Sequence, residues 1–356
     1  MARIQAHRLR DLDAVSEPEQ TGALRTLSRY SIQRWRQGEL GALPVILGLV
    51  VIAAYFQSQE STFLSARNLS NLVLQIAATG SVAVGIVLVL LLGEIDLSVG
   101  SVAGLCSALL GVLIVNDGWP WWLAILAALA TGAAIGAFQG AWFALAGVPS
   151  FVVTLAGFLA WQGVQLRVLG STGTVNVFEP HIEKIAQSYL PATWGWLLGL
   201  GAAALYGLSL WTEHVRRLRK GLVSAPVAVL VARTALLFAL ATAGVEILNR
   251  FNGVPTAGVI LFGLVVLFSL VTTRTRFGRY VFAVGGNAEA ARRAGVNVSR
   301  IRIAVFSLAG LMAAVGGIVF VSRLTAASTQ TGSGTFLLEA IAAAVIGGTS
   351  LFGGRG

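Results

Sequence analysis

Residues 70–92 read SNLVLQIAATGSVAVGIVLVLLL, and no side chain among them carries a charge. The run has the length that an α-helix needs to cross the hydrocarbon core of a bilayer, about 20 residues. Similar apolar runs recur along the chain, so about ten transmembrane helices are expected. The expected spans lie near residues 40–57, 70–92, 98–115, 121–145, 150–169, 194–211, 227–248, 255–273, 303–322 and 336–350.

The composition agrees with a membrane protein. Only 11% of the residues are charged, 56% are hydrophobic, and the mean hydropathy is +0.80. A soluble domain would carry roughly a quarter charged residues. Only helices and closed barrels satisfy their backbone hydrogen bonds in lipid, and barrel strands would give short alternating segments instead of continuous apolar runs. The sequence therefore predicts an all-α polytopic membrane protein.

The basic residues predict the orientation of the spans. If the N-terminus is cytoplasmic, the tail 1–38 and the loops 212–226 and 274–302 lie on the same side and hold most of the arginines and lysines. This distribution follows the positive-inside rule. It explains the net charge of +10 without nucleic-acid binding. We expect a cytoplasmic N-terminal tail over 1–38 and a transmembrane domain over 39–356.

Glycines recur at every fourth residue in the expected span 121–145, at Gly132, Gly136 and Gly140. This spacing places them on one helical face, where a second helix can approach closely. The stripe therefore predicts tight helix packing.

Two glycine-containing polar segments interrupt apolar runs: GEIDLSVG at 93–100 and GGTSLFGG at 347–354. Broken helices at matching positions are typical of transporters built from two repeated halves. These segments supply the candidate gate or helix-break residues, which are Gly93, Glu94, Asp96, Ser98, Gly100, Gly347, Gly348 and Thr349.

Carboxylates in or near the membrane indicate function by default. Asp96 has a second interpretation, because Asp96 or Ser98 can cap the helix that begins at this segment. A helix cap, a substrate gate and a proton site all remain open for Asp96. Glu339 has the same ambiguity.

The loop 274–302 contains a sequence with helix signals at both ends. Asn287 suits an N-cap, AEAARRA at 288–294 places its acid early and its bases late, and Gly295 suits the position after the C-cap. The segment is either an amphipathic surface helix or a helix that docks on a cytoplasmic partner. Its candidate docking residues are Asn287, Glu289, Ala290, Ala291, Arg292, Arg293 and Gly295.

Three separated motifs resemble permease subunits of ABC sugar importers of the ribose/xylose type. They are GEIDLSVGS at 93–101, the loop motif with GRY at 278–280, GGN at 285–287, EAA at 289–291 and GVN at 295–297, and EAIAAAVIGGTSLFGG at 339–354. The long stretch 212–255 resembles the xylose-type members more closely. Members of that family usually continue for two further spans, so the resemblance implies that the C-terminal half of the permease bundle is incomplete here.

The resemblance implies an inner-membrane permease for a pentose-like sugar. It also implies three partners: a cytoplasmic ABC ATPase, a periplasmic sugar-binding protein and a second permease copy. The chain contains no G-x-x-x-x-G-K-[ST] phosphate loop. We therefore expect no cofactor in this chain, with ATP and Mg used by the partner ATPase, and no enzyme activity of its own.

An uncharged sugar favours a pathway lined by small and polar groups. The candidates are Gln75, Gln139, Gln162, Gln165 and Asn176, with an interhelical hydrogen bond as the alternative role for each. The outward loop 170–193, with Glu179, Glu183 and Lys184, is either a contact for the binding protein or an ordinary solvated loop.

Two other classes of function compete with this interpretation. An ion-coupled secondary transporter would use Glu94, Asp96 and Glu339 as coupling sites. An intramembrane protease or esterase would need a motif such as H-E-x-x-H or G-x-S-x-G, and the sequence has neither.

Overall fold

The computed structural model describes residues 43–222 and 224–356, so the expected tail 1–38 lies outside the described residues. The chain divides into two compact units. The larger unit contains residues 45–197 and 244–356, and the described part of the smaller unit is mainly the helical hairpin within 198–243.

The described chain is mostly helical. The helices of the larger unit are α4 (Ala66–Leu91), α5 (Val99–Val115), α6 (Trp121–Leu145), α7 (Ser150–Leu169), α8 (Pro180–Gln187), α11 (Thr256–Arg274), α12 (Arg276–Gly286), α13 (Ala288–Arg293), α14 (Val298–Leu324) and α15 (Phe336–Ile346). Three helices have residues in both units: α3 (Leu43–Gln59), α9 (Ala192–Arg219) and α10 (Val227–Asn249).

The helices match the expected spans in position. Seven of those described are long and apolar enough to cross a membrane, namely α4, α6, α7, α9, α10, α11 and α14. The other three expected spans fall on the shorter apolar helices α3, α5 and α15. The prediction of an all-α polytopic fold is confirmed.

The core of the larger unit forms around α14, which packs against α4, α5 and α6. The α5 helix is buried along most of its length. By contrast, α6 and α7 present large apolar side chains outward, and Leu145 is 71% exposed and Leu159 63% exposed. Apolar surface of this extent is stable in lipid, where no water has to hydrate it.

The glycine stripe of α6 lies directly against α14. A β-carbon added at Gly136 would meet the backbone carbonyl of Phe306, and one added at Gly140 would lie 3.0 Å from the Cα atom of Ile303. Only a residue without a side chain permits this approach of two backbones. The packing role predicted for the stripe is confirmed.

We expect Gly136→Ala to destabilise the bundle by about 1–3 kcal/mol, the usual cost of overpacking. The added methyl group has to displace backbone atoms of α14 instead of the flexible end of a side chain. The midpoint of thermal unfolding of the purified protein in detergent measures this loss.

Gly163→Ala is the matched control, because an added β-carbon at this α7 position meets no atom within 4 Å. Alanine forms helices better than glycine, so this variant should unfold at the parental temperature or slightly above it. Equal midpoints for the two variants would contradict the tight α6–α14 contact.

The segment 170–193 has more structure than the expected solvated loop. It contains the short 3-10 turn η2 (Gly170–Thr172), the helix α8, and two strands. The strand β1 (Thr174–Asn176) pairs antiparallel with β4 (Ala326–Ser328), and β2 (Tyr189–Leu190) pairs antiparallel with β3 (Val254–Pro255). The segment is therefore not an irregular loop, and its contact with a binding protein stays a prediction.

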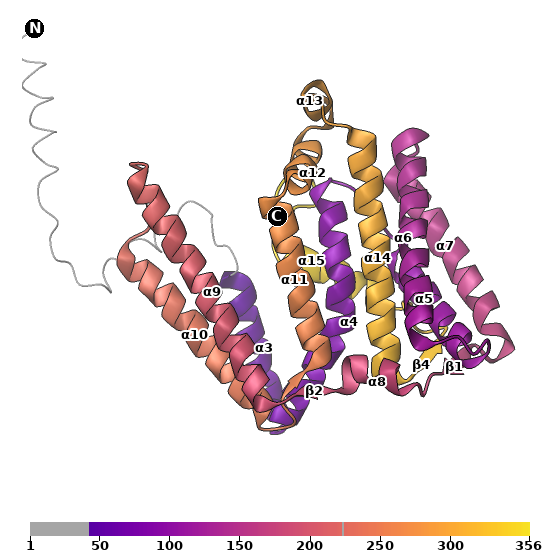
Figure 1. Cartoon of the computed structure of the whole chain (residues 1–356), viewed down its shortest axis with the longest axis horizontal. Coiled ribbons are helices and arrows are strands. Elements are labelled where there is room, and N and C mark those ends of the chain that lie inside the picture. The colour runs from indigo at the N-terminus through magenta and orange to yellow at the C-terminus, as the bar shows by residue number, and fades with distance from the viewer. Residues whose placement is uncertain (1–42, 223) are drawn as a thin grey trace, which may run out of the picture. The chain divides into compact units, whose positions relative to one another are not determined.

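Two expected loop boundaries were wrong. The α9 helix continues to Arg219, so its basic residues lie on a helix instead of in the loop 212–226. The expected loop 274–302 contains α12, α13 and the first turn of α14. Figure 1 shows α12 and α13 at one end of the larger unit, with α8, β1 and β4 at the opposite end.

Candidate functional site

The helix α13 has both of its ends capped, as the sequence indicates. The Oδ1 atom of Asn287 accepts a hydrogen bond from the N–H of Ala290 at 2.9 Å. After the helix, Gly295 adopts a φ of +84°, which glycine tolerates best, and the N–H of Val296 bonds the carbonyl of Ala291 at 3.0 Å. These bonds hold a single turn and a half of helix in a fixed shape.

The charged side chains of α13 point outward, while Ala291 packs inward with 5% of its surface exposed. Glu289 forms ion pairs of 3.2 Å with Arg292 and with Arg293. Ion pairs at this exposure contribute little to stability. The ion pairs instead hold the three charged side chains of α13 in a fixed arrangement on its outer face.

The α12 helix leads directly into α13 and packs against the end of α4 through a glycine. A β-carbon added at Gly285 would meet the carbonyl oxygen of Leu91, and it would lie 2.9 Å from the backbone nitrogen of Gly354. The N–H of Gly354 donates to that same Leu91 carbonyl at 2.9 Å. Gly353 lies equally close, since its β-carbon would be 2.7 Å from the nitrogen of Gly93.

These contacts bring all three sequence motifs to one place. We call the meeting point of Gly93, Gly285, Gly353 and Gly354 the glycine junction. It joins the loop between α4 and α5, the last turn of α12 and the C-terminal segment, through backbone contacts that leave no space for side chains. The backbone of α12 therefore contacts the end of α4 directly at Leu91, and it contacts the α4–α5 loop through Gly353.

Glu94 connects the same loop to two further helices. Its carboxylate accepts a hydrogen bond of 2.7 Å from the hydroxyl of Ser150 at the start of α7. It also lies 3.7 Å from the guanidinium of Arg302 in the first turns of α14. Burial raises the pKa of Glu94, and the Ser150 bond and the Arg302 charge oppose that rise. The Arg302 guanidinium stacks 4.3 Å above the ring of Phe143.

Asp96 accepts hydrogen bonds from the backbone N–H of Ser98 at 2.8 Å and from its hydroxyl at 2.6 Å. The bonded N–H belongs to Ser98, which holds the N-cap position of α5, so Asp96 lies beside the start of the helix without being its N-cap, and its role stays a prediction. The Ser98 side chain itself makes no capping bond.

Gln139 of α6 extends this polar cluster. Its amide oxygen lies 2.8 Å from the Ser98 hydroxyl, whose single proton already serves Asp96. Within the described residues the amide nitrogen of Gln139 is buried without a partner. Exchanging the amide oxygen and nitrogen gives a consistent chain in which Gln139 donates to Ser98 and Ser98 donates to Asp96.

The remaining candidates for the sugar pathway do not gather around this cluster. Gln165 is buried and donates to the carbonyls of Ser328, in β4, and of Thr331, in the turn after it, at 2.9 and 3.2 Å, so its partners are not on another helix. Gln75 is exposed on α4, Asn176 is exposed in β1, and Gln162 is partly buried.

The other candidate gate residues do not share one environment: some are closely packed, some are exposed and one is buried. A β-carbon at Gly100 would lie 2.6 Å from the carbonyl oxygen of Gly332, so this glycine serves close packing. Gly347 and Gly348 are exposed after α15, whereas Thr349 is buried. Glu339 is exposed and accepts a bond of 2.6 Å from Thr335.

Sequence reasoning missed Ser150, Arg302 and Phe143. The arginine was recognised only as one positive charge of the loop 274–302. Its carboxylate partner lies far away along the chain, and no local periodicity connects the two.

Comparison with known proteins identifies the family. Residues 68–354 match the family model described as "Branched-chain amino acid transport system / permease component". No solved structure matches the chain.

Three curated relatives cover most of the chain. The xylose transport system permease protein XylH of Escherichia coli (strain K12) is 43% identical over 314 residues, which is 88% of this chain and 79% of that protein. The ribose import permease protein RbsC of the same strain is 32% identical, over 92% and 82% of the two chains. The autoinducer 2 import system permease protein LsrC of Salmonella typhi is 31% identical, over 87% and 71%.

Proposed function

We propose that this chain, which belongs to the family of permease components of branched-chain amino acid transport systems, is the membrane-spanning subunit of an ATP-driven importer of a pentose-like sugar. The observation that carries the proposal is the identity of 43% to a xylose permease over 88% of the chain. The ribose permease, at 32%, supports the same chemical class of substrate with less weight. Xylose is therefore the substrate that we expect.

In this proposal α13 docks on a cytoplasmic ATPase. Three features support that role: the helix is capped at both ends, it presents a charged outer face, and it lies at one end of the larger unit. ATP and Mg then belong to the partner, and the permease supplies no nucleotide chemistry and needs no cofactor.

The glycine junction and Glu94 provide the mechanical connection from α13 to the bundle. Movement of the docked helix carries α12, and the junction passes that movement to the α4–α5 loop. The contact of Glu94 with Arg302 links the same loop to α14, which begins just after α13. Alternating access in this proposal is a rearrangement of α4, α5 and α14 that ATP binding at the partner drives.

The proposal also includes an arrangement in the bacterial inner membrane. Ten spans with a cytoplasmic N-terminus would place α13 inside the cell and the end with α8 outside, facing a periplasmic sugar-binding protein. Two permease copies would enclose the pathway. The basic residues of the α9 end and of the α11–α14 region support this orientation.

Uptake of labelled xylose into proteoliposomes tests the function. The vesicles contain the permease with the ATPase of its own system, and the sugar-binding protein is added on the side that corresponds to the periplasm. We expect uptake that requires hydrolysable ATP and persists when an ionophore removes the proton gradient. An excess of unlabelled xylose should compete more strongly than ribose.

The control vesicles hold the permease alone under an imposed proton or sodium gradient. Strong uptake in these vesicles would contradict the proposal and would favour the ion-coupled alternative, with Glu94, Asp96 and Glu339 as its coupling candidates.

A further inference from the structure

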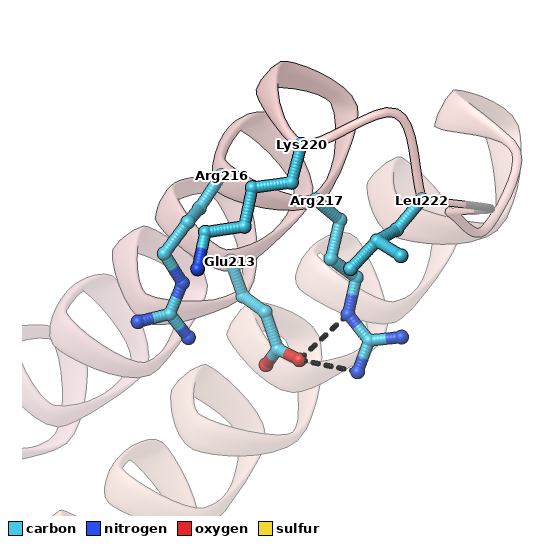
Figure 2. A pocket seen from close by; sticks show the side chains of 5 residues that line it. All are labelled: Glu213, Arg216, Arg217, Lys220 and Leu222. Carbon is cyan, nitrogen blue, oxygen red and sulfur yellow. Dashed lines mark hydrogen bonds and ion pairs between the residues drawn. The ribbon is translucent and has the colours of Figure 1, made fainter.

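The inner end of the α9–α10 hairpin carries a cluster of exposed basic residues around a pocket. The pocket has a volume of about 340 Å³ and is lined by Glu213, Arg216, Arg217, Lys220 and Leu222 (Figure 2). All five residues belong to the smaller unit. The proposed transport function assigns no role to this site.

The charges in the pocket do not balance. Glu213 is occupied by Arg217, whose Nε and Nη2 atoms donate to one carboxylate oxygen at 2.9 and 2.6 Å. In the part of the chain that the structure describes, Arg216 and Lys220 have no carboxylate partner. Figure 2 shows these two side chains on the same side of Glu213, with Arg217 on the other side. The pocket therefore offers two uncompensated cations to an anion.

The surface beside the pocket is apolar. Along α9, Leu205 is 71% exposed and Leu208 60% exposed, and both precede the charged turn. Leu222, in the wall of the pocket, is 55% exposed. A ligand that satisfies both regions combines an anionic head with apolar chains.

The hairpin turn holds the site in place. The Nδ1 atom of His214 lies 2.7 Å from the hydroxyl oxygen of Ser224, which connects the end of α9 to the segment before α10. The ring of Trp211 packs edge-on against His214, with ring centroids 6.2 Å apart. An aromatic residue at this position also suits the headgroup level of a membrane.

We propose that this pocket binds an anionic phospholipid, with the phosphate between Arg216 and Lys220 and the acyl chains along the apolar face of α9. Clusters of basic residues at the end of a spanning helix attract anionic lipids in this way. The inference holds whether or not the transported molecule is a sugar.

Titration of the purified full chain with phosphatidylglycerol in detergent, followed by native mass spectrometry, tests the proposal. We expect Arg216→Gln with Lys220→Gln to weaken phosphatidylglycerol binding roughly 30-fold, because each of the two basic residues near an anionic surface raises the affinity about fivefold. Phosphatidylcholine, which has no net charge, should bind both proteins equally weakly. Millimolar inorganic phosphate should not displace the bound lipid, because it lacks the apolar chains.

Two variants serve as controls. The pair Arg292→Gln and Arg293→Gln removes the same charge from α13 and should keep phosphatidylglycerol binding. The exchange Arg216→Lys with Lys220→Arg keeps both cations and should retain most of it. Undiminished lipid binding by the Gln double variant would overturn the proposal. If the variant that keeps the lipid also loses the ATPase, the cluster is a protein contact instead.

Discussion

We expect Gly285→Ala to reduce ATP-driven xylose uptake by about five- to 150-fold while the ATPase still co-purifies with the permease. The added β-carbon would overlap the Leu91 carbonyl oxygen and lie 2.9 Å from the backbone nitrogen of Gly354, so α12 has to move away from α4. Overpacking of this kind costs about 1–3 kcal/mol. If that cost weakens the coupling between the docked ATPase and the bundle by the same amount, uptake falls about five- to 150-fold. Uptake and ATP hydrolysis are measured on the same proteoliposomes.

The neighbouring residue gives a closely matched control. Gly286 is also in the last turn of α12, yet a β-carbon added there meets no atom within 4 Å. Gly286→Ala should therefore transport at nearly the parental rate. Normal uptake by the Gly285 variant would contradict the role of the glycine junction, and loss of the ATPase would show that the substitution disturbs docking instead of coupling.

The glycine junction shows why the sequence reveals the three motifs but not that they contact one another. Residues 93–100 and 347–354 can each be recognised as a motif on their own, because glycine and polar residues interrupt apolar runs there. Their contact with Gly285 depends on how α4, α12 and the C-terminal segment pack, and a single sequence carries no local signal for such packing. The same limit applies to Glu94 and Arg302.

Local physical signals predicted much of the fold. The span 70–92 follows from its length and apolarity, and the capping of α13 follows from Asn287 and Gly295, which lie where the cap geometry needs them. The glycine stripe of α6 predicted close packing because its four-residue spacing is itself a helical property. In each of these three cases, residues that are close together in the sequence are enough to predict the feature.

The predictions from the sequence were wrong where polar residues were taken to mark the end of a helix or to exclude regular secondary structure. The α9 helix continues through Arg216, Arg217 and Arg219, because arginine and leucine are good helix formers even after the apolar span ends. The segment 170–193 contains strands of only two or three residues. Such strands are too short to give a periodic pattern, and the distant strands with which they pair determine them.

The second large effect concerns docking. We expect the charge exchange Glu289→Arg with Arg293→Glu to abolish co-purification with the ATPase, a loss of about 100-fold or more in affinity. The two residues form an ion pair of 3.2 Å at i and i+4, so the exchange keeps the net charge of α13 and this one pair, while it removes the pair of Glu289 with Arg292. It reverses the charges that the partner meets, and like charges facing each other across an interface cost several kcal/mol.

The same exchange on α10 separates docking from a general effect of the substitution. Glu246 and Arg250 form another exposed i, i+4 ion pair at 3.2 Å. Glu246→Arg with Arg250→Glu should leave the ATPase bound, because this pair lies close to the β2–β3 ladder, at the end of the molecule that the proposed topology places outside the cell. Both variants exchange the charges of an exposed i, i+4 ion pair and keep the net charge, and such pairs contribute little to stability, so a difference between the two variants isolates the partner contact. Equal retention of the ATPase by the two variants would mean that the charged face of α13 does not bind it.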